Sequence, residues 1–375
     1  MMQDDIKKGL LGIVVDETEV SKVMPEINSL TYRGYAAQDL CARCKFEEVA
    51  YLILNKDLPN KKQLKDFEKI EKKERTLSKS LINILKQMPK KSHPMDVART
   101  AVSVMGLEDK ETGNNSPKAN MSKAMRIFSK TPTALAAFYR LRKGKKIISP
   151  KKNLSFAENF FYMCFGKIPN KEIVKAFDVS LILYAEHSFN VSTFAARTIT
   201  SSLSDIHGAI TGAIASLKGR LHGGANEEVM HMMKKIKKPE NALKWINNAL
   251  DKKDVVMGFG HRVYKSGDSR VPTMCEYFKK VAKIKKDKTY EKIYSIVEKV
   301  MIKRKNIHPN VDYPTGPTYH LMGFDTDFFT PIFVISRITG WSAHIMEQHA
   351  ANKLIRPLAS YKGNKHRQVV QLNQR

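Results

Sequence analysis

The sequence predicts a mainly α-helical fold that consists of a large helical domain and a smaller helical domain. Apolar residues recur at three- and four-residue intervals over long stretches, which is the spacing of one helix face. Sustained alternation of apolar and polar residues, which would indicate strands, is missing after residue 20. At 375 residues the chain is too long for one simple core, so we expect a second domain or an insertion.

The first elements follow from local patterns in the N-terminal third of the chain. The segment GLLGIVVDETEVSKV contains a β-branched run and predicts a strand or small hairpin. Apolar residues at helical spacing predict helices within 36–55 and 61–87. A further helix is predicted over 92–106, with Ser92 as its N-cap and a proline near its first turn.

Polar loops and Thr-Pro pairs mark the later elements. Residues 108–120 predict a loop, and Thr131 is the expected start of a helix that ends at Gly144. A second Thr-Pro pair, at Thr330, opens a long apolar helix, and the tail after Tyr361 predicts an extended arm or a disordered end. Further helices are predicted at 154–165, 172–186, 191–202, 205–219 and 226–236.

The composition predicts a globular protein that does not span a membrane. Hydrophobic residues make up 42% of the chain, and no apolar run reaches the roughly 18 residues that a membrane helix needs. The start, MMQDDIKKGLL, resembles neither a signal peptide nor a transit peptide. We therefore expect a cytoplasmic protein of prokaryotic origin.

The net charge of +28 raises the question of nucleic-acid binding. The lysines occur as doublets on polar helix faces without interleaved aromatic residues, and no helix-turn-helix, zinc-finger or RNP pattern is evident. A lysine-rich proteome explains the charge most simply, so we predict no nucleic-acid partner. The positive field would still attract a polyanionic ligand such as coenzyme A.

Two spacings could indicate metal or redox sites, and we predict neither. Cys41 and Cys44 form a CxxC, but no second CxxC exists and the pair lies in an amphipathic helical pattern, so reduced helix residues are expected. Glu228 and His231 form an ExxH, but a helical di-iron site needs a second such pair, which the chain lacks.

Three short motifs carry the residues for one particular chemistry. His222 opens HGGANE, whose glycines allow a sharp turn and the close approach of a ligand just before a predicted helix. His261 lies in GFGHRVYK, and Asp312 ends NVD. Two imidazoles and a carboxylate suit the removal of a proton beside one carbonyl while a second carbonyl is polarised. Such a base needs a hydrogen bond to the forming enolate oxygen, so the set predicts carbon–carbon bond formation through an enol.

The residues around His261 include a further arginine and do not fit a dinucleotide-binding motif. Gly258 and Gly260 begin a GxGxxG, but Val263 replaces the third glycine and no buried strand clearly precedes, so we exclude a dinucleotide site. The backbone there could recognise an adenine edge instead. Arg270, nine residues after His261, suits a substrate carboxylate.

Three other residues have competing structural interpretations. His187 ends a predicted helix and could be a satisfied core histidine. Arg337 lies in the apolar helix, where it is costly unless it pairs with an anion, either a structural partner or a ligand. Arg356, in LIRP, could be an ordinary surface residue.

Taken in order, these motifs resemble the citrate synthase family. HGGANE, GFGHRVYK followed by SR, NVD, FTPIFVISRITGW and LIRP occur in the family order, and LTYRGY, FEEVAYLI and HPMD extend the resemblance over nearly the whole chain. SHPMDVARTAVS, LYAEHSFNVSTFAAR, HRVYKSGDSRVPTM and DYPTGPTYHLMGFD are most similar to the 2-methylcitrate synthase branch. Ser269 before Arg270 departs from the proline common there.

The resemblance implies a role for each motif. His222 would hydrogen-bond the thioester carbonyl, Asp312 would remove the α-proton of propionyl-CoA or acetyl-CoA, and His261 would polarise the keto group of oxaloacetate. Water would then release 2-methylcitrate or citrate and free CoA. The coenzyme A thioester is a substrate, and no cofactor or metal is expected.

The resemblance also implies the binding residues. Oxaloacetate would be held by His187, Arg270 and Arg337, with Arg356 reaching in from the second subunit of a homodimer and Arg75 as a further contact on a weak local motif. The adenine end of CoA would lie on the backbone of Val255, Val256, Met257, Gly258 and Phe259.

We expect residues 1–222 and 318–375 to form the large, dimer-forming domain and 223–317 the small domain, which would close over the site. Three alternatives stay open. The chain could be a citrate synthase proper with acetyl-CoA as its main substrate, a lyase running in reverse on citryl-CoA, or a basic nucleic-acid-binding protein with a decayed synthase fold.

Overall fold

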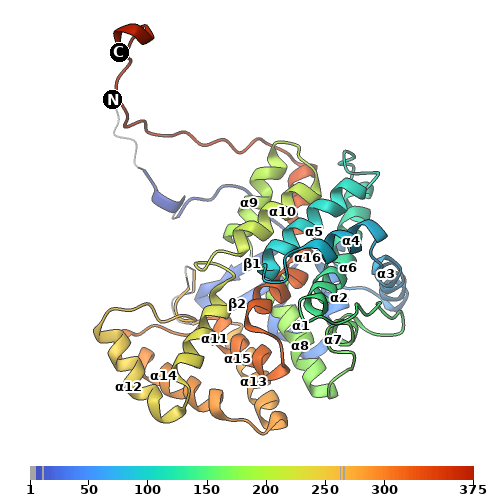
Figure 1. Cartoon of the computed structure of the whole chain (residues 1–375), viewed down its shortest axis with the longest axis vertical. Helices are drawn as coiled ribbons and strands as arrows, with labels where there is room; N and C mark the ends of the chain where they lie inside the picture. Colours follow the sequence, from blue (N-terminus) through green and yellow to red (C-terminus); the bar gives the residue numbers. More distant parts are fainter. Residues whose placement is uncertain (1–5, 11, 262, 265–266) are drawn as a thin grey trace.

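The computed structural model describes residues 6–10, 12–261, 263–264 and 267–375, and most of its regular structure is helical (Figure 1). The larger group of helices comprises α1 (Ala37–Arg43), α2 (Phe46–Asn55), α3 (Lys61–Glu74), α4 (Lys79–Gln87), α5 (Pro94–Glu108), α6 (Pro117–Leu141), α7 (Phe156–Phe165), α8 (Lys171–Tyr184), α9 (Val191–Ser201), α10 (Ile206–Leu217) and α16 (Phe329–Ala350). The predicted mainly α fold is confirmed.

A second group of helices lies together at the lower left of Figure 1. It comprises α11 (Ala225–Ile236), α12 (Pro239–Asp251), α13 (Val271–Lys285), α14 (Thr289–Lys305) and α15 (Asp312–Met322). Within it α15 packs on α11 and α13, and α12 on α14, while α13 and α15 also contact α8 of the larger group. The expected domain boundary at 317/318 falls inside α15, and the division into two domains stays a prediction.

Helix α16 forms the centre of the larger group. Its residues from Phe329 to Ile345 are buried without a break, and it packs against α2, α6, α8, α9 and α10. A helix that is apolar on all sides must be surrounded by others. This central position brings Arg337, in the middle of α16, beside the end of α8.

The strands form one small antiparallel sheet in the order β1 (Ser21–Met24), β2 (Ser29–Tyr32) and β3 (Tyr35–Ala36), with Ser21 opposite Tyr32. The segment at 9–23 predicts a strand or hairpin, but the first strand forms only at its end, at Ser21. The β-branched run at 13–15 is largely exposed, whereas the strands that form carry the fully buried Leu30 and Tyr32. Burial of one face, rather than strand propensity, decides which segment pairs.

Two predicted helix starts are wrong. Helix α5 is capped by His93, whose Nδ1 accepts the Met95 amide, and not by Ser92. Helix α6 begins at Pro117 behind Ser116 and runs straight through Pro132, so Thr131 is interior rather than an N-cap. The predicted loop therefore shrinks to 109–116. By contrast, α7 to α11 match their predicted ranges within two residues.

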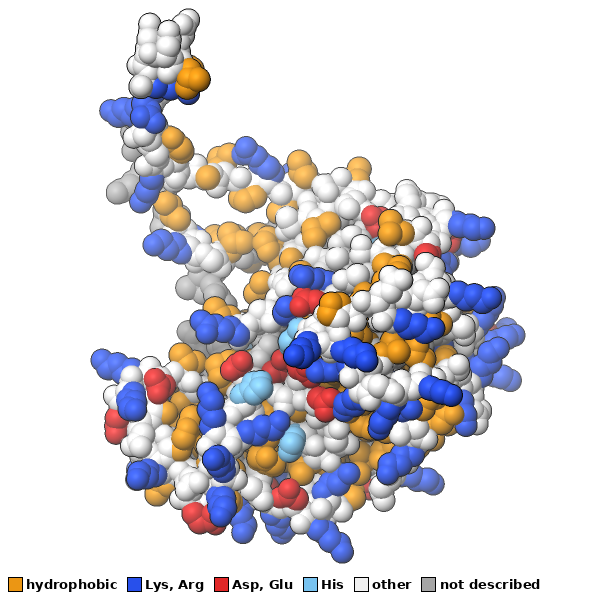
Figure 2. All heavy atoms as spheres, in the orientation of Figure 1, with side chains coloured by type: hydrophobic (Ala, Val, Ile, Leu, Met, Phe, Trp, Pro, Cys, Tyr) orange, Lys and Arg blue, Asp and Glu red, His pale blue; other side chains and the backbone are white. Residues whose placement is uncertain are grey.

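Both ends of the chain leave the helical body on the same side (Figure 1). The C-terminal tail is extended and mostly exposed from residue 351, apart from a short 3-10 turn (Leu372–Gln374). Lysine and arginine side chains are spread over the face seen in Figure 2 and outnumber the acidic ones. None of the helices in the described ranges combines the length and apolarity of a membrane crossing. Cys41 and Cys44 are free thiols in and just after α1.

Candidate active site

His222 lies in the tight connection between α10 and α11. Gly223 is required there, because a Cβ on it would come within 2.5 Å of the Leu217 side chain. The backbone N–H of Ser192 donates to His222 Nε2 over 3.3 Å, so the ring proton lies on Nδ1. Burial, together with the charge of Arg337, lowers the pKa of His222 to about 3. The imidazole is therefore neutral and can offer one N–H to a ligand.

Asp312 is the first residue of α15, and its backbone N–H donates to Asn310 Oδ1. Its Oδ1 accepts a 2.6 Å hydrogen bond from the Tyr184 hydroxyl. Burial raises the pKa of Asp312 to about 6, although the Tyr184 hydrogen bond and the charge of Arg270 act to lower it. A carboxylate with a raised pKa in an enclosed site is suited to accepting a proton near neutral pH.

His261 is held in the opposite tautomer to His222. Its Nδ1 accepts the backbone N–H groups of Val263 (3.1 Å) and Tyr264 (3.2 Å), so its proton lies on Nε2. The ring centre is 5.1 Å from that of His187. Burial and the charge of Arg270 lower the pKa of His261 to about 4. His261 is thus a second neutral hydrogen-bond donor.

Beside these groups lies a cluster of buried basic side chains with unused hydrogen-bonding capacity. Arg270 is held by both oxygens of Asp268, at 2.9 and 2.7 Å. Arg337 Nε donates to the Tyr184 carbonyl, but its NH1 has no hydrogen-bond partner in the described part of the chain, and neither has His187 Nε2. Burial lowers the pKa of Arg337 to about 10, so it remains a cation. Such a site favours a small anion with several carboxylate oxygens.

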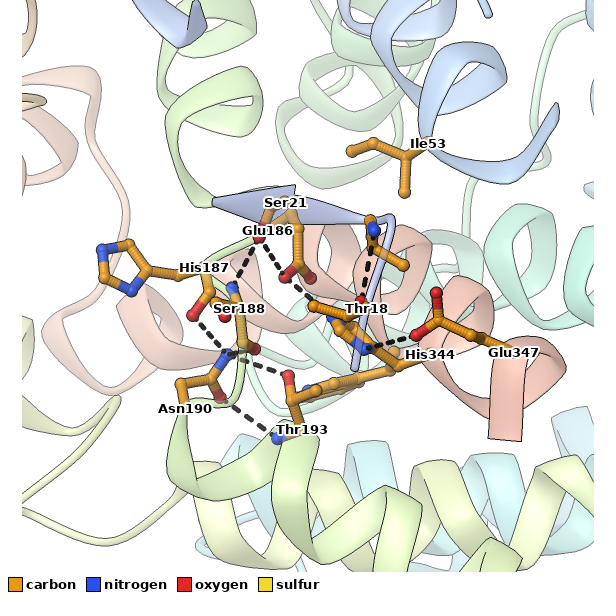
Figure 3. A network of polar contacts seen from close by, with 12 residues as sticks. Thr18, Ser21, Ile53, Glu186, His187, Ser188, Asn190, Thr193, His344 and Glu347 are labelled. Atoms are coloured by element: carbon orange, nitrogen blue, oxygen red, sulfur yellow. Dashed lines mark hydrogen bonds and ion pairs between the residues drawn. The ribbon is translucent and has the colours of Figure 1, made fainter. Parts of the chain in front are cut away.

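The segment that carries His187 is fixed by a buried polar network (Figure 3). Glu186 Oε1 accepts hydrogen bonds from Ser21 Oγ (3.0 Å) and His344 Nε2 (2.9 Å), and Ser21 Oγ accepts the backbone N–H of Ser188 (2.8 Å). In Figure 3 the His187 ring points away from Glu186. The network therefore holds the residues on both sides of His187 and leaves its ring free.

Sequence reasoning missed Tyr184, Glu186, Ser192 and Asp268. One signal was present: Gly340, in SRITGW, lies against Glu186, and a Cβ there would be 2.1 Å from Glu186 Oε2. A glycine in the middle of an apolar helix can indicate that another group approaches the backbone closely. Tyr184, Ser192 and Asp268 have no comparable signal, since their roles arise from contacts between distant helices.

The loops that carry His261 and Asp312 are joined by backbone hydrogen bonds. The Asn310 N–H donates to the Gly258 carbonyl (2.9 Å) and the Gly260 N–H to the His308 carbonyl (2.8 Å). Gly258 has φ +84°, and a Cβ on it would come within 2.6 Å of Val229. A cavity of about 270 Å³ opens beside His261 and this paired strip.

The stretch predicted to line an adenine ring borders this strip. Val255 is 81% exposed, whereas Val256 is buried, and the Phe259 ring packs on Tyr313 with centres 4.4 Å apart. The five predicted residues follow the end of α12 after a connection of three residues, 252–254: Val255, Val256, Met257, Gly258 and Phe259. Their backbone is thus displayed next to His261, and their contact with CoA stays a prediction.

Two predicted arginines lie apart from the cluster. Arg75 is buried in an ion pair with Glu71 (2.8 and 2.7 Å) and donates to the carbonyls of Lys151 and Leu154. That arrangement links the end of α3 to the segment before α7, and it does not favour the predicted substrate contact. Arg356 is exposed at the start of the C-terminal tail, just after Ile355, whose backbone N–H donates to Ser201 Oγ at the end of α9 (3.1 Å).

Comparison with known proteins identifies the family. A model described as citrate synthase, C-terminal domain, matches residues 9–358. The chain is 52% identical over 363 residues to a 2-methylcitrate synthase of Mycobacterium tuberculosis, covering 97% of this chain and 92% of that protein. It is also 52% identical to a citrate synthase of Mycolicibacterium smegmatis, with 97% of each chain covered.

A solved structure agrees with these relatives. It is the ternary complex of citrate synthase from Thermoplasma acidophilum with carboxymethyl coenzyme A and oxaloacetate. It matches with a TM-score of 0.92 at 32% identity and covers 99% of this chain and 100% of that chain. The chain therefore belongs to the citrate synthase family and is an acyltransferase that condenses an acyl-CoA with oxaloacetate.

Proposed function

We propose that the chain condenses propionyl-CoA, and also acetyl-CoA, with oxaloacetate and water, and so releases 2-methylcitrate or citrate together with CoA. The observation that carries the site assignment is the opposite tautomers of two neutral histidines around one carboxylate. His222 presents Nδ1–H and His261 presents Nε2–H, while Asp312 is the group able to accept a proton.

In the first step Asp312 removes the α-proton of the acyl thioester. The Nδ1–H of His222 donates to the thioester oxygen, which stabilises the enol as the proton leaves. The His222 imidazole is neutral, so it stabilises the enol by donating a hydrogen bond and does not act as a charged imidazolium. The raised pKa of Asp312 makes the proton transfer less unfavourable than for an exposed aspartate.

In the second step the enol carbon attacks the keto carbon of oxaloacetate. His261 donates its Nε2 proton toward the keto oxygen, on which negative charge develops. Arg270, Arg337 and His187 hold the two carboxylates, which lie beside the two nitrogens without a hydrogen-bond partner in the part of the chain that the structure describes, Arg337 NH1 and His187 Nε2. Water then cleaves the thioester of the condensed product, and CoA leaves as the thiol.

We also propose that the working unit is a homodimer in which Arg356 reaches the partner's oxaloacetate. The C-terminal tail supports this. Leu354, Leu358, Val369 and Leu372 are all at least 63% exposed on an extended segment that leaves its own helical body. Apolar side chains on such an arm gain stability only by covering another surface, and in the proposed dimer that surface would belong to the second copy, with Arg356 directed to its site.

The cytoplasm is the proposed location. All four cysteines are free, and two of them are buried, as suits a reducing compartment.

The preference for propionyl-CoA over acetyl-CoA is the most specific part of the proposal. It rests on the sequence similarity to 2-methylcitrate synthases, because one methylene in a pocket is worth only about 1–3 kcal/mol. The test is kcat/KM for propionyl-CoA and for acetyl-CoA at saturating oxaloacetate, followed through release of the CoA thiol. A higher value for propionyl-CoA is expected. A clear preference for acetyl-CoA would make the chain a citrate synthase proper.

A further inference from the structure

We propose that His93 and Asp96, from the HPMD motif, are positioning residues that hold the His222 loop at both of its ends. The proposal rests on the catalytic role proposed for His222. Neither residue touches the histidine itself. Each bonds a residue on one side of the 219–224 connection, so together they determine where that connection starts and stops.

The first contact joins His93 to the start of α11. His93 Nδ1 accepts the Met95 amide as the N-cap of α5, which leaves its proton on Nε2. That Nε2–H lies 3.1 Å from Oε2 of Glu227, the last residue of HGGANE. The His93 ring thus uses one nitrogen to start its own helix and the other to hold the chain after His222.

Glu227 extends this contact to α16. Its Oε1 accepts the backbone N–H of Thr330 over 3.3 Å and also the Thr330 hydroxyl. Glu227 is buried, so its carboxylate needs these donors. One side chain therefore joins the N-terminal turns of α5, α11 and α16, and Thr330 Oγ1 also contacts the carbonyl of Gly223, next to His222.

The second contact joins Asp96 to the end of α10. Both carboxylate oxygens of Asp96 accept from Lys218 Nζ, at 2.8 and 2.7 Å. Lys218 is the C-cap of α10, the residue at which the chain enters the His222 loop. Asp96 also pairs with Arg99 on its own helix at 3.0 Å. Since one turn of α5 carries both His93 and Asp96, the two ends of the loop share a single support.

The loop between these ends has little conformational freedom. The N–H groups of His222 and Gly224 both donate to the Gly219 carbonyl, at 2.8 and 3.3 Å, and a Cβ on Gly224 would come within 3.0 Å of the Lys218 carbonyl. A displacement of either end is therefore passed to the His222 ring. Misplacing a catalytic group by about 1 Å can cost roughly a hundredfold in rate.

A pair of variants at one position separates positioning from folding. In His93→Asn the side-chain oxygen can still cap α5, but the side chain is too short to reach Glu227. In His93→Gln the amide nitrogen takes the place of Nε2 and can still donate to Glu227, but the cap is weakened. We expect kcat to fall about tenfold in His93→Asn and to stay within about twofold in His93→Gln. The affinity for oxaloacetate should not change in either variant.

The second contact has its own matched pair. Asp96→Asn weakens the ion pair with Lys218 and should lower kcat about threefold, whereas Arg99→Gln removes only the other partner of Asp96 and should leave kcat unchanged. Lys218→Met breaks the same ion pair from the opposite side and should reproduce Asp96→Asn. It also replaces that variant if Asp96→Asn does not fold.

Amide hydrogen exchange at 219–224 provides a readout that does not depend on activity. Faster exchange there in His93→Asn than in His93→Gln supports the proposal. Equal exchange, or equal loss of kcat in the two variants, would overturn it. His222→Ala serves as the reference. If His222→Ala kept full activity, the proposed role of His222 would fail, while exchange at 219–224 would still decide whether His93 holds the loop.

Discussion

The hydroxyl of Tyr184 and the carboxylate of Asp312 lie 2.6 Å apart, although 128 positions separate them in the chain. The hydrogen bond runs from the end of α8 to the first turn of α15. It fixes one oxygen of Asp312 and leaves the other to accept a proton. The position of the proposed base therefore depends on how α15 packs against α8.

Replacing Tyr184 by phenylalanine should raise the pKa of Asp312, because the lost hydrogen bond lowers it. Asp312 must be ionised to act as the base, so activity falls as the pH drops through its pKa of about 6. In Tyr184→Phe that fall should begin at higher pH, and kcat at pH 7 should drop about tenfold. The measurement is the pH profile of kcat/KM.

Tyr319→Phe is the matched control for this variant. It also removes a buried hydroxyl, but one that donates to Ser180 rather than to Asp312. Its acid limb should coincide with that of the unmodified protein. Equal shifts in the two variants would mean that the hydroxyl of Tyr184 has no specific effect on Asp312.

Removal of the carboxylate tests the base directly. Asp312→Ala should lower turnover by orders of magnitude, while the binding of oxaloacetate survives because its proposed ligands are other residues. Turnover is followed by thiol release and binding by calorimetry. Near-normal turnover would exclude Asp312 as the base.

The same carboxylate should lower the stability of the fold. Its pKa rises from 3.8 to about 6 on folding, so the folded state binds the proton more tightly than the unfolded state. The free energy of unfolding is therefore not reduced below about pH 4. The reduction grows as the pH rises from about 4 to 6 and reaches its full size above that range. Asp312→Asn should therefore unfold with a free energy about 1–3 kcal/mol higher at pH 7, and the gain should vanish near pH 4. Urea unfolding at both pH values checks this, and an equal gain at both would point to another cause.

Arg337 should contribute to binding more than to folding. Its NH1 is buried without a partner among the described residues, so the guanidinium gains most when an anion is present. Arg337→Ala should weaken oxaloacetate binding roughly 10- to 100-fold, with only a small change in the melting temperature of the free protein. Unchanged affinity would remove Arg337 from the oxaloacetate site.

Gly340→Ala should disturb the network behind His187. The added methyl group would come within 2.6 Å of the Ala185 carbonyl as well as reaching Glu186. We expect a loss of about 1–3 kcal/mol of stability and weaker oxaloacetate binding. Gly113→Ala, where a Cβ meets nothing within 4 Å, is the control and should alter neither property.

The helical class and the catalytic motifs could be predicted because both are local. Apolar spacing reports the buried face of each helix, and HGGANE, GFGHRVYK and NVD each combine a functional residue with the turn residues that display it. Helix starts were less predictable. The Thr-Pro pair at Thr330 lies in the first turn of α16, which begins one residue earlier at Phe329. The same pair at Thr131 lies inside α6, where burial on all sides outweighs the hydrogen bond that Pro132 cannot make.

The supporting residues of the site were not predictable in the same way. Tyr184 and Asp268 act through partners on other segments, so nothing next to them in the sequence indicates the contact. Arg75 is the opposite case: the sequence suggests a substrate contact, but its guanidinium already donates to Glu71 and to two backbone carbonyls. Local sequence identifies which groups can react, and tertiary packing decides which of them have free atoms.

The backbone pairing of the His261 loop with the 308–312 segment links the positions of two proposed catalytic groups. The proposed donor for the keto acid, His261, and the proposed base, Asp312, are carried on one strip, so a displacement of one is transmitted to the other. The placement of Asp312 therefore depends on the placement of the loop that carries His261.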